Sequence, residues 1–135
     1  MNWKEFEELA RKVMSQYFGV KLAEKKPRGF PKRFDMVSAD QSIVGDAKFL
    51  TLVRRKKTPP AKLMEICAHV WLLEKVDATN RFLVFGNQRR VPEMWLEKYG
   101  NLVQNVEFYF IDSRENVENL RKTMTKQRKL IARTI

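Results

Sequence analysis

The chain has 135 residues, which is enough for one domain and too short for two ordinary ones. Hydrophobic residues make up 44% and aromatic residues 11%, so the chain can build a packed core and is not disordered throughout. Lysine and arginine number 27 against 16 aspartate and glutamate, a formal net charge of +11. This excess indicates a polyanionic partner, either nucleic acid or an anionic membrane surface.

Several classes of protein are excluded. The longest apolar runs are four residues long, as at 70–73 and 82–85, so no segment can span a bilayer. The N-terminus lacks the basic and then apolar layout of a secretory signal. A single cysteine, Cys67, and a single histidine, His69, exclude an internal disulfide and a Cys/His zinc site. The sequence therefore predicts a soluble, cytoplasmic protein that forms one domain over 1–135.

The N-terminal half predicts a helix followed by strands. Apolar side chains recur at three- and four-residue intervals after Asn2, a plausible N-cap, and Gly19 ends the pattern. The expected elements are a helix at 2–18, a short strand beginning at 20–22, an exposed basic loop at 25–33, strands at 34–39 and 43–50, and a second basic loop at 54–57. Asp40-Gln41 lies between the last two strands and predicts a hairpin.

The C-terminal half alternates helices and strands. The expected elements are an apolar helix at 61–76, a buried strand at 82–85, a short helix at 92–99, a strand at 106–111 and a tail that is helical from Glu115 onward. The full order predicts a mixed α/β domain in which helices cover a central sheet.

The hairpin carries the most informative residues. If the turn is centred on Asp40-Gln41, the residue numbers of each opposed pair sum to 81. Asp35 then faces Asp46, with Cβ atoms about 4.5–5.5 Å apart. Side chains alternate along a strand, so Lys48 projects on the same side as Asp46. Opposed like charges are destabilising unless a cation lies between them.

A hard divalent ion such as Mg²⁺ suits two carboxylates together with water and phosphate oxygens. The neighbouring Lys48 can orient or deprotonate a water, or stabilise the charge that grows on a phosphate under attack. On a basic protein, this combination indicates phosphodiester hydrolysis. The structural alternative is that these residues only form a salt-bridged sheet surface, because an Asp followed later by Asp-x-Lys occurs by chance in many unrelated chains.

These residues resemble the PD-(D/E)xK nuclease superfamily, which includes restriction endonucleases, archaeal Holliday-junction resolvases and Mrr-type enzymes. The family core is αβββαβ, and residues 2–112 match that order, which leaves 115–135 as an accessory basic helix. Asp35 matches the first acidic position, Asp46 the Asp/Glu position and Lys48 the lysine. The family proline before the first acid is replaced by Phe34.

The resemblance implies a restriction-endonuclease-like fold and an Mg²⁺-dependent DNA endonuclease, with Mn²⁺ able to substitute. It further implies that Asp35, Asp46 and the Ala47 carbonyl hold one or two metal ions while Lys48 positions the attacking water. The segment Phe6-Glu7-Glu8-Leu9 is similar to the helical Phe-Glu-x-x segment of Mrr-like members, whose glutamate reaches the metal site.

Helix geometry separates the two glutamates of that segment. At about 100° per residue, Glu7 lies about 80° from the centre of the apolar stripe and Glu8 lies nearly opposite it. Glu7 can therefore reach a site at the rim of the sheet, whereas Glu8 is expected to face solvent.

Other residues have ordinary structural or phosphate-contact interpretations. His69 is more simply a structural or flanking histidine, with Glu65 as a possible partner four residues earlier. Cys67, Trp71 and Trp95 are more simply core residues. The residues expected to contact DNA phosphates are Lys25, Lys26, Arg28, Lys32, Arg33, Arg54, Arg55, Lys56, Lys57, Arg89 and Arg90.

The sequence leaves three functional hypotheses open. The leading one is a metal-dependent DNA endonuclease, either structure-selective or specific as a homo-oligomer such as a dimer. The alternative is a non-catalytic nucleic-acid-binding or assembly protein of the same fold. A peripheral membrane protein fits poorly because the basic clusters lie in loops, although the tail from Glu115 could serve such a role.

Overall fold

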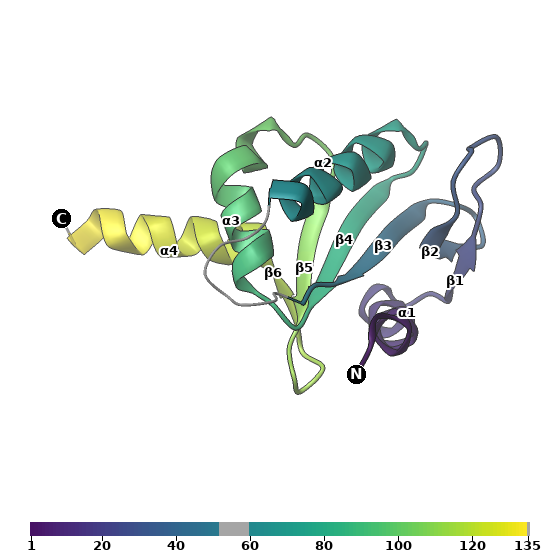
Figure 1. Ribbon diagram of the computed structural model, residues 1–135, viewed down its shortest axis with the longest axis horizontal. Helices are drawn as coiled ribbons and strands as arrows, with labels where there is room; N and C mark the ends of the chain where they lie inside the picture. The colour runs from purple at the N-terminus through teal and green to yellow at the C-terminus, as the bar shows by residue number, and fades with distance from the viewer. Residues whose placement is uncertain (52–59, 135) are drawn as a thin grey trace.

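A computed structural model describes residues 1–51 and 60–134 (Figure 1). The helices are α1 (Trp3–Phe18), α2 (Pro60–Lys75), α3 (Arg90–Tyr99) and α4 (Leu120–Thr134), with a 3-10 turn η1 (Gly100–Leu102). The strands are β1 (Leu22–Lys25), β2 (Phe34–Ser38), β3 (Ile43–Phe49), β4 (Asn80–Gly86), β5 (Glu107–Ile111) and β6 (Val117–Asn119).

The strands form one six-stranded mixed sheet in the order β1-β2-β3-β4-β5-β6. β3, β4 and β5 run parallel to one another, whereas β1–β2, β2–β3 and β5–β6 are antiparallel pairs. The two parallel pairs need crossover connections, and these contain α2 and α3. The predicted mixed α/β architecture with helices on a central sheet is therefore confirmed.

Helices cover both faces of the sheet (Figure 1). The buried side chains of α2 and α3 join one core cluster, which includes Leu83 and Phe85 of β4. The buried side chains of α1 join a second cluster, which includes Phe82 and Val84 of the same strand. Alternate residues of β4 thus serve opposite faces, as expected for a strand buried on both sides.

The N-terminal helix begins and ends as the sequence predicts. Asn2 accepts a hydrogen bond from the Glu5 backbone N–H at 2.9 Å, and the Glu5 carboxylate accepts one from the Asn2 N–H at 3.0 Å, which forms a capping box. Gly19 ends α1 with φ of 71°, a left-handed conformation that glycine adopts without steric cost. The ends of the predicted apolar stripe are nevertheless exposed, with Trp3 at 57% and Tyr17 at 50%.

The tail differs from its prediction. Val117–Asn119 forms β6 against β5, so the expectation of a helix from Glu115 is wrong for these residues. The helix α4 starts at Leu120, which is fully buried in the core cluster of α2 and α3. The sheet and core therefore continue past residue 112, where the sequence placed the end of the core.

Smaller differences concern α3 and two tryptophans. α3 starts at Arg90, two residues before the predicted position. Trp95 is buried, as expected, but Trp71 is 59% exposed, so its assignment to the core is wrong. The basic loop predicted at 54–57 lies outside the described residues. Within those residues, no helix combines the length and apolar character needed to cross a membrane.

Candidate active site

The β2–β3 hairpin has the register that the sequence predicts. Met36 faces Gly45 and Val37 faces Val44, so the residue numbers of each opposed pair sum to 81. The turn is fastened by Asp40, whose carboxylate accepts hydrogen bonds from the Ser42 backbone N–H at 3.0 Å and the Ser42 hydroxyl at 2.7 Å. The two hydrogen bonds from Ser42, together with one from the Ser38 hydroxyl, lower the pKa of this carboxyl to about 2.

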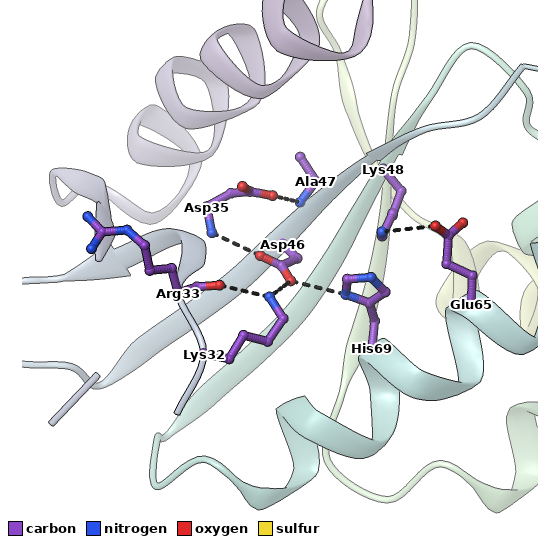
Figure 2. A network of polar contacts seen from close by, with 8 residues as sticks. All are labelled: Lys32, Arg33, Asp35, Asp46, Ala47, Lys48, Glu65 and His69. Carbon is purple, nitrogen blue, oxygen red and sulfur yellow. Dashed lines mark hydrogen bonds and ion pairs between the residues drawn. The ribbon is translucent and has the colours of Figure 1, made fainter. Parts of the chain in front are cut away.

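Beyond the last paired residues, two aspartates bridge the strands through their side chains (Figure 2). The Asp35 backbone N–H donates to Asp46 Oδ1 at 2.9 Å, and the Ala47 backbone N–H donates to Asp35 Oδ2 at 2.9 Å. Each carboxylate therefore binds the backbone of the opposite strand. This reciprocal bonding holds both acids at the end of the ladder.

The second oxygen of Asp46 binds two cationic or polar groups. Lys32 Nζ donates to Asp46 Oδ2 at 2.8 Å, and His69 Nδ1 lies 3.1 Å from the same oxygen (Figure 2). Burial acts to raise the pKa of Asp46, but the bond to His69 and the ammonium of Lys32 outweigh it, so the pKa lies below its ordinary value. An ionised carboxylate only accepts hydrogen bonds, so His69 carries its proton on Nδ1.

Asp35 has the opposite electrostatic environment. Burial and the neighbouring charge of Asp46 raise the pKa of Asp35 to about 7, although the Ala47 N–H favours the ionised form. Two carboxylates within one small site thus titrate far apart. This is the pattern that often marks a functional site.

Three acids from three elements gather around Asp35. Carboxylate oxygens of Glu7 on α1, Glu24 on β1 and Asp35 on β2 all lie within 4.8 Å of one another. Burial raises the pKa of Glu7, with a further contribution from Glu24, while Arg11 opposes the shift. Oxygen donors at this spacing suit a hard divalent cation such as Mg²⁺.

Helix α1 is fastened to β2 beside this acidic group. The Arg11 guanidinium donates to the Asp35 backbone carbonyl at 3.0 Å. Glu7 is half-buried while Glu8 is exposed, which agrees with the helix geometry predicted from the sequence.

Lys48 projects toward α2, as does Asp46, in agreement with the predicted alternation. Its Nζ lies 3.9 Å from Glu65 Oε1, an ion pair that Figure 2 shows beside His69. Burial lowers the pKa of Lys48, and the nearby carboxylates of Glu65, Asp46 and Asp35 only partly offset this effect. A lysine with a lowered pKa exchanges protons more readily than an exposed one.

The residues predicted to contact DNA fall into different environments. Lys32 binds Asp46, and Arg33 lies 3.8 Å from Glu24. Arg89 pairs with Glu93 and Glu118, and Arg90 Nη1 lies 3.3 Å from Glu97. Lys26 and Arg28 are exposed, Lys25 is half-buried, and Arg54, Arg55, Lys56 and Lys57 lie outside the described residues.

Four residues of this site were not predicted to belong to it: Glu24, Lys32, Glu65 and His69. Glu65 and His69 lie four residues apart in the apolar middle of α2, a spacing that places both side chains on one face toward β3. That polar pair was a usable signal. Glu24 gave none, because an acid at the end of a short strand is ordinary.

No family model, no curated protein and no solved structure matches this chain. Function is therefore inferred from the residues and their geometry.

Proposed function

We propose that this protein is a divalent-metal-dependent DNA endonuclease of the PD-(D/E)xK type, with a restriction-endonuclease-like fold. The supporting observation is the reciprocal bonding of Asp35 and Asp46 at the end of the hairpin, with Lys48 two residues further on β3. The net charge of +11 supports a polyanionic substrate.

The donor set at this site fits Mg²⁺ or Mn²⁺. Asp35 and Asp46, together with the Ala47 carbonyl, are the residues that would hold the ion, and Glu7 and Glu24 supply further oxygens beside Asp35. When bound, the ion would supply Lewis-acid activation of the scissile phosphate. The raised pKa of Asp35 supports this assignment, because a nearby cation would relieve the repulsion that causes it.

In this proposal the chain's own residues position the reactants. Lys48 holds the attacking water through its amine, whose lowered pKa allows it to exchange a proton with that water. As the water oxygen bonds to phosphorus, the proton of the water passes to the neutral Lys48 amine. The bond from phosphorus to the leaving oxygen breaks in line with the attack, and the leaving oxygen takes up a proton from solvent. Glu65 and His69 orient Lys48 and Asp46, respectively, through the contacts at 3.9 Å and 3.1 Å.

A second candidate function is a non-catalytic nucleic-acid-binding or assembly protein. One observation favours it: both oxygens of Asp46 already have partners from the chain itself, namely Asp35, Lys32 and His69. A satisfied network of this kind can simply hold the strands together. Binding without cleavage, and without any dependence on a divalent ion, would support this candidate.

The test is a cleavage panel of linear, flap and four-way-junction DNA, with Mg²⁺, with Mn²⁺ and with chelator. We expect cutting of at least one substrate with metal and none with chelator. Glu7→Gln should reduce the rate at least tenfold, whereas the matched Glu8→Gln, on the exposed face of the same helix, should leave it unchanged. Metal-independent binding with no cutting would contradict the proposed enzyme.

A further inference from the structure

The helix α4 carries a strongly basic surface away from the candidate active site. Its sequence contains six lysine and arginine residues and no aspartate or glutamate. At about 100° per residue, four of the six fall within a stripe about 60° wide. These residues, here named the α4 basic stripe, are Lys122, Lys126, Lys129 and Arg133, and all four are exposed.

Packing fixes the direction in which this stripe faces. Leu120 is fully buried, and Met124 packs against the same core cluster, so the opposite side of α4 meets the body of the protein. Arg121 adds to this attachment by donating to the backbone carbonyls of Val106 at 3.3 Å and Gly100 at 3.2 Å. The α4 basic stripe therefore faces outward along a helix that extends away from the sheet (Figure 1).

Among the residues that the structure describes, the α4 basic stripe has no acidic partner of the kind that pairs with Arg89 and Arg90. Arg89 and Arg90 at the start of α3 pair with glutamates, but no ion pair within the described residues involves the α4 basic stripe. A groove of about 400 Å³ runs beside it, lined by Arg121, Lys122, Lys126 and Lys129 with Thr125 and Glu107. Glu107 is the single acid among the described residues of that lining, and it accepts a hydrogen bond from Asn119 at 3.0 Å.

We infer that the α4 basic stripe binds the sugar–phosphate backbone of a nucleic acid. From Lys122 to Arg133 the helix rises roughly 16 Å, with a cation about every 4.5–6 Å. One strand of a duplex carries a phosphate about every 3.4 Å along its axis, so roughly five phosphates face the four cations. Contacts of this kind position the protein without reading sequence.

This surface is distinct from the β2–β3 site. β6, which leads into α4, is separated from β3 by β4 and β5, a distance of roughly 14 Å across the sheet. Binding at the stripe does not require metal or cleavage, so the inference goes beyond the proposed enzyme and can hold if that proposal fails.

An anionic membrane is the competing partner for a basic amphipathic helix, but α4 suits it less well. Membrane-surface helices insert a continuous apolar face, usually with aromatic residues. The apolar face of α4 is partly used by the protein itself, because Leu120 and Met124 pack against the core. α4 has no aromatic residue.

The experiment compares two triple variants of the full chain that lower the net charge equally. In the stripe variant, Lys122, Lys126 and Lys129 are each changed to Gln. In the control variant, the exposed Lys12, Lys21 and Lys98 on other parts of the molecule are changed to Gln. Affinity for a fluorescent 20-base-pair duplex is measured by anisotropy in chelator over a range of salt concentrations.

For the stripe variant, we expect the slope of log K against log[salt] to become shallower by about 2 to 3, because each lost phosphate contact contributes about 0.9. The control should change the slope by less than about 1. Equal effects of the two variants, or an unchanged slope for the stripe variant, would overturn the inference. So would loss of binding to phosphatidylserine vesicles by the stripe variant with DNA binding intact, since that result would assign the stripe to a membrane.

Discussion

Asp35→Asn is expected to stabilise the protein in the absence of metal, and only above acidic pH. The unfolded carboxyl ionises near pH 4, whereas the folded one holds its proton until about pH 7. Between these values the folded state binds more protons, so the stability of the wild type falls as pH rises from about 4 to about 7. Asparagine has no such titration, and its Oδ1 can still accept the Ala47 N–H.

The size of the effect follows from the pKa of Asp35. The pKa of Asp35 differs by about three between the folded and unfolded states, and a difference of one in pKa corresponds to about 1.4 kcal/mol. The product is about 4 kcal/mol without screening. The side chain is only half-buried, so solvent screening reduces this to about 1–2 kcal/mol. We therefore expect Asp35→Asn to be about 1–2 kcal/mol more stable than the wild type at pH 8, and equal to it at pH 4.

The assay is urea unfolding in chelator at pH 4, 6 and 8, followed by tryptophan fluorescence. Taking the difference between the two proteins cancels titrating groups that do not interact with Asp35. Asp46 does interact with it, but the lowered pKa of Asp46 places its own loss of stability below pH 4, outside the range compared. The exposed Glu8→Gln serves as a control and should show no pH-dependent difference. If the difference between the wild type and Asp35→Asn were the same at pH 4 and pH 8, the electrostatic account of this site would be refuted.

Two further predictions concern catalysis and packing. Asp46→Ala should abolish cleavage and lose Mn²⁺ affinity, whereas Lys48→Ala should lose cleavage but keep Mn²⁺ affinity, as measured by calorimetry; equal loss of affinity in both would show that the roles are misassigned. Gly86→Ala should destabilise the protein by about 1–3 kcal/mol in urea unfolding, because a Cβ there would lie 2.3 Å from the Phe6 ring. An unchanged midpoint would mean that α1 moves freely on the sheet.

The hairpin could be predicted because its determinants are local. Turn residues at Asp40-Gln41 and a strict two-residue alternation fix which side chains oppose one another, and the pairs of Met36 with Gly45 and Val37 with Val44 agree. The order of helices and strands was largely predictable for the same reason. The β6 strand was missed because three residues are too few to show alternation, and Val117 and Leu120 also fit a helical spacing.

The partners of Asp46 could not be predicted, since they depend on packing across long stretches of chain. His69 is 23 residues away and reaches Asp46 only through the way α2 lies on the sheet. Lys32, 14 residues away, was expected to face phosphates because it lies in a basic loop. Sequence patterns report which face a residue occupies, but not which residue of another element it meets.

Lys32 is the residue for which the two proposed functions, metal-dependent enzyme and non-catalytic binding protein, predict opposite results. Its ammonium compensates the buried charge of Asp46 and also lies over the Phe34 ring, with 4.4 Å from Nζ to the ring centre. Lys32→Met keeps the apolar stem and removes the charge, which should cost about 1–2 kcal/mol without metal, since His69 and the Asp35 N–H still bind Asp46. The exposed Lys26→Met in the same loop is the control.

If Asp46 binds metal, Lys32 competes with the ion for Oδ2, and its removal should tighten Mn²⁺ binding in calorimetry. Added Mn²⁺ should then restore the lost stability, because the cation provides the compensation that the ammonium provided. If the network is only structural, Lys32→Met should be destabilised to the same extent with and without Mn²⁺. A loss of Mn²⁺ affinity in Lys32→Met would contradict competition at Asp46, because removing a competing ammonium can only favour binding of the metal ion.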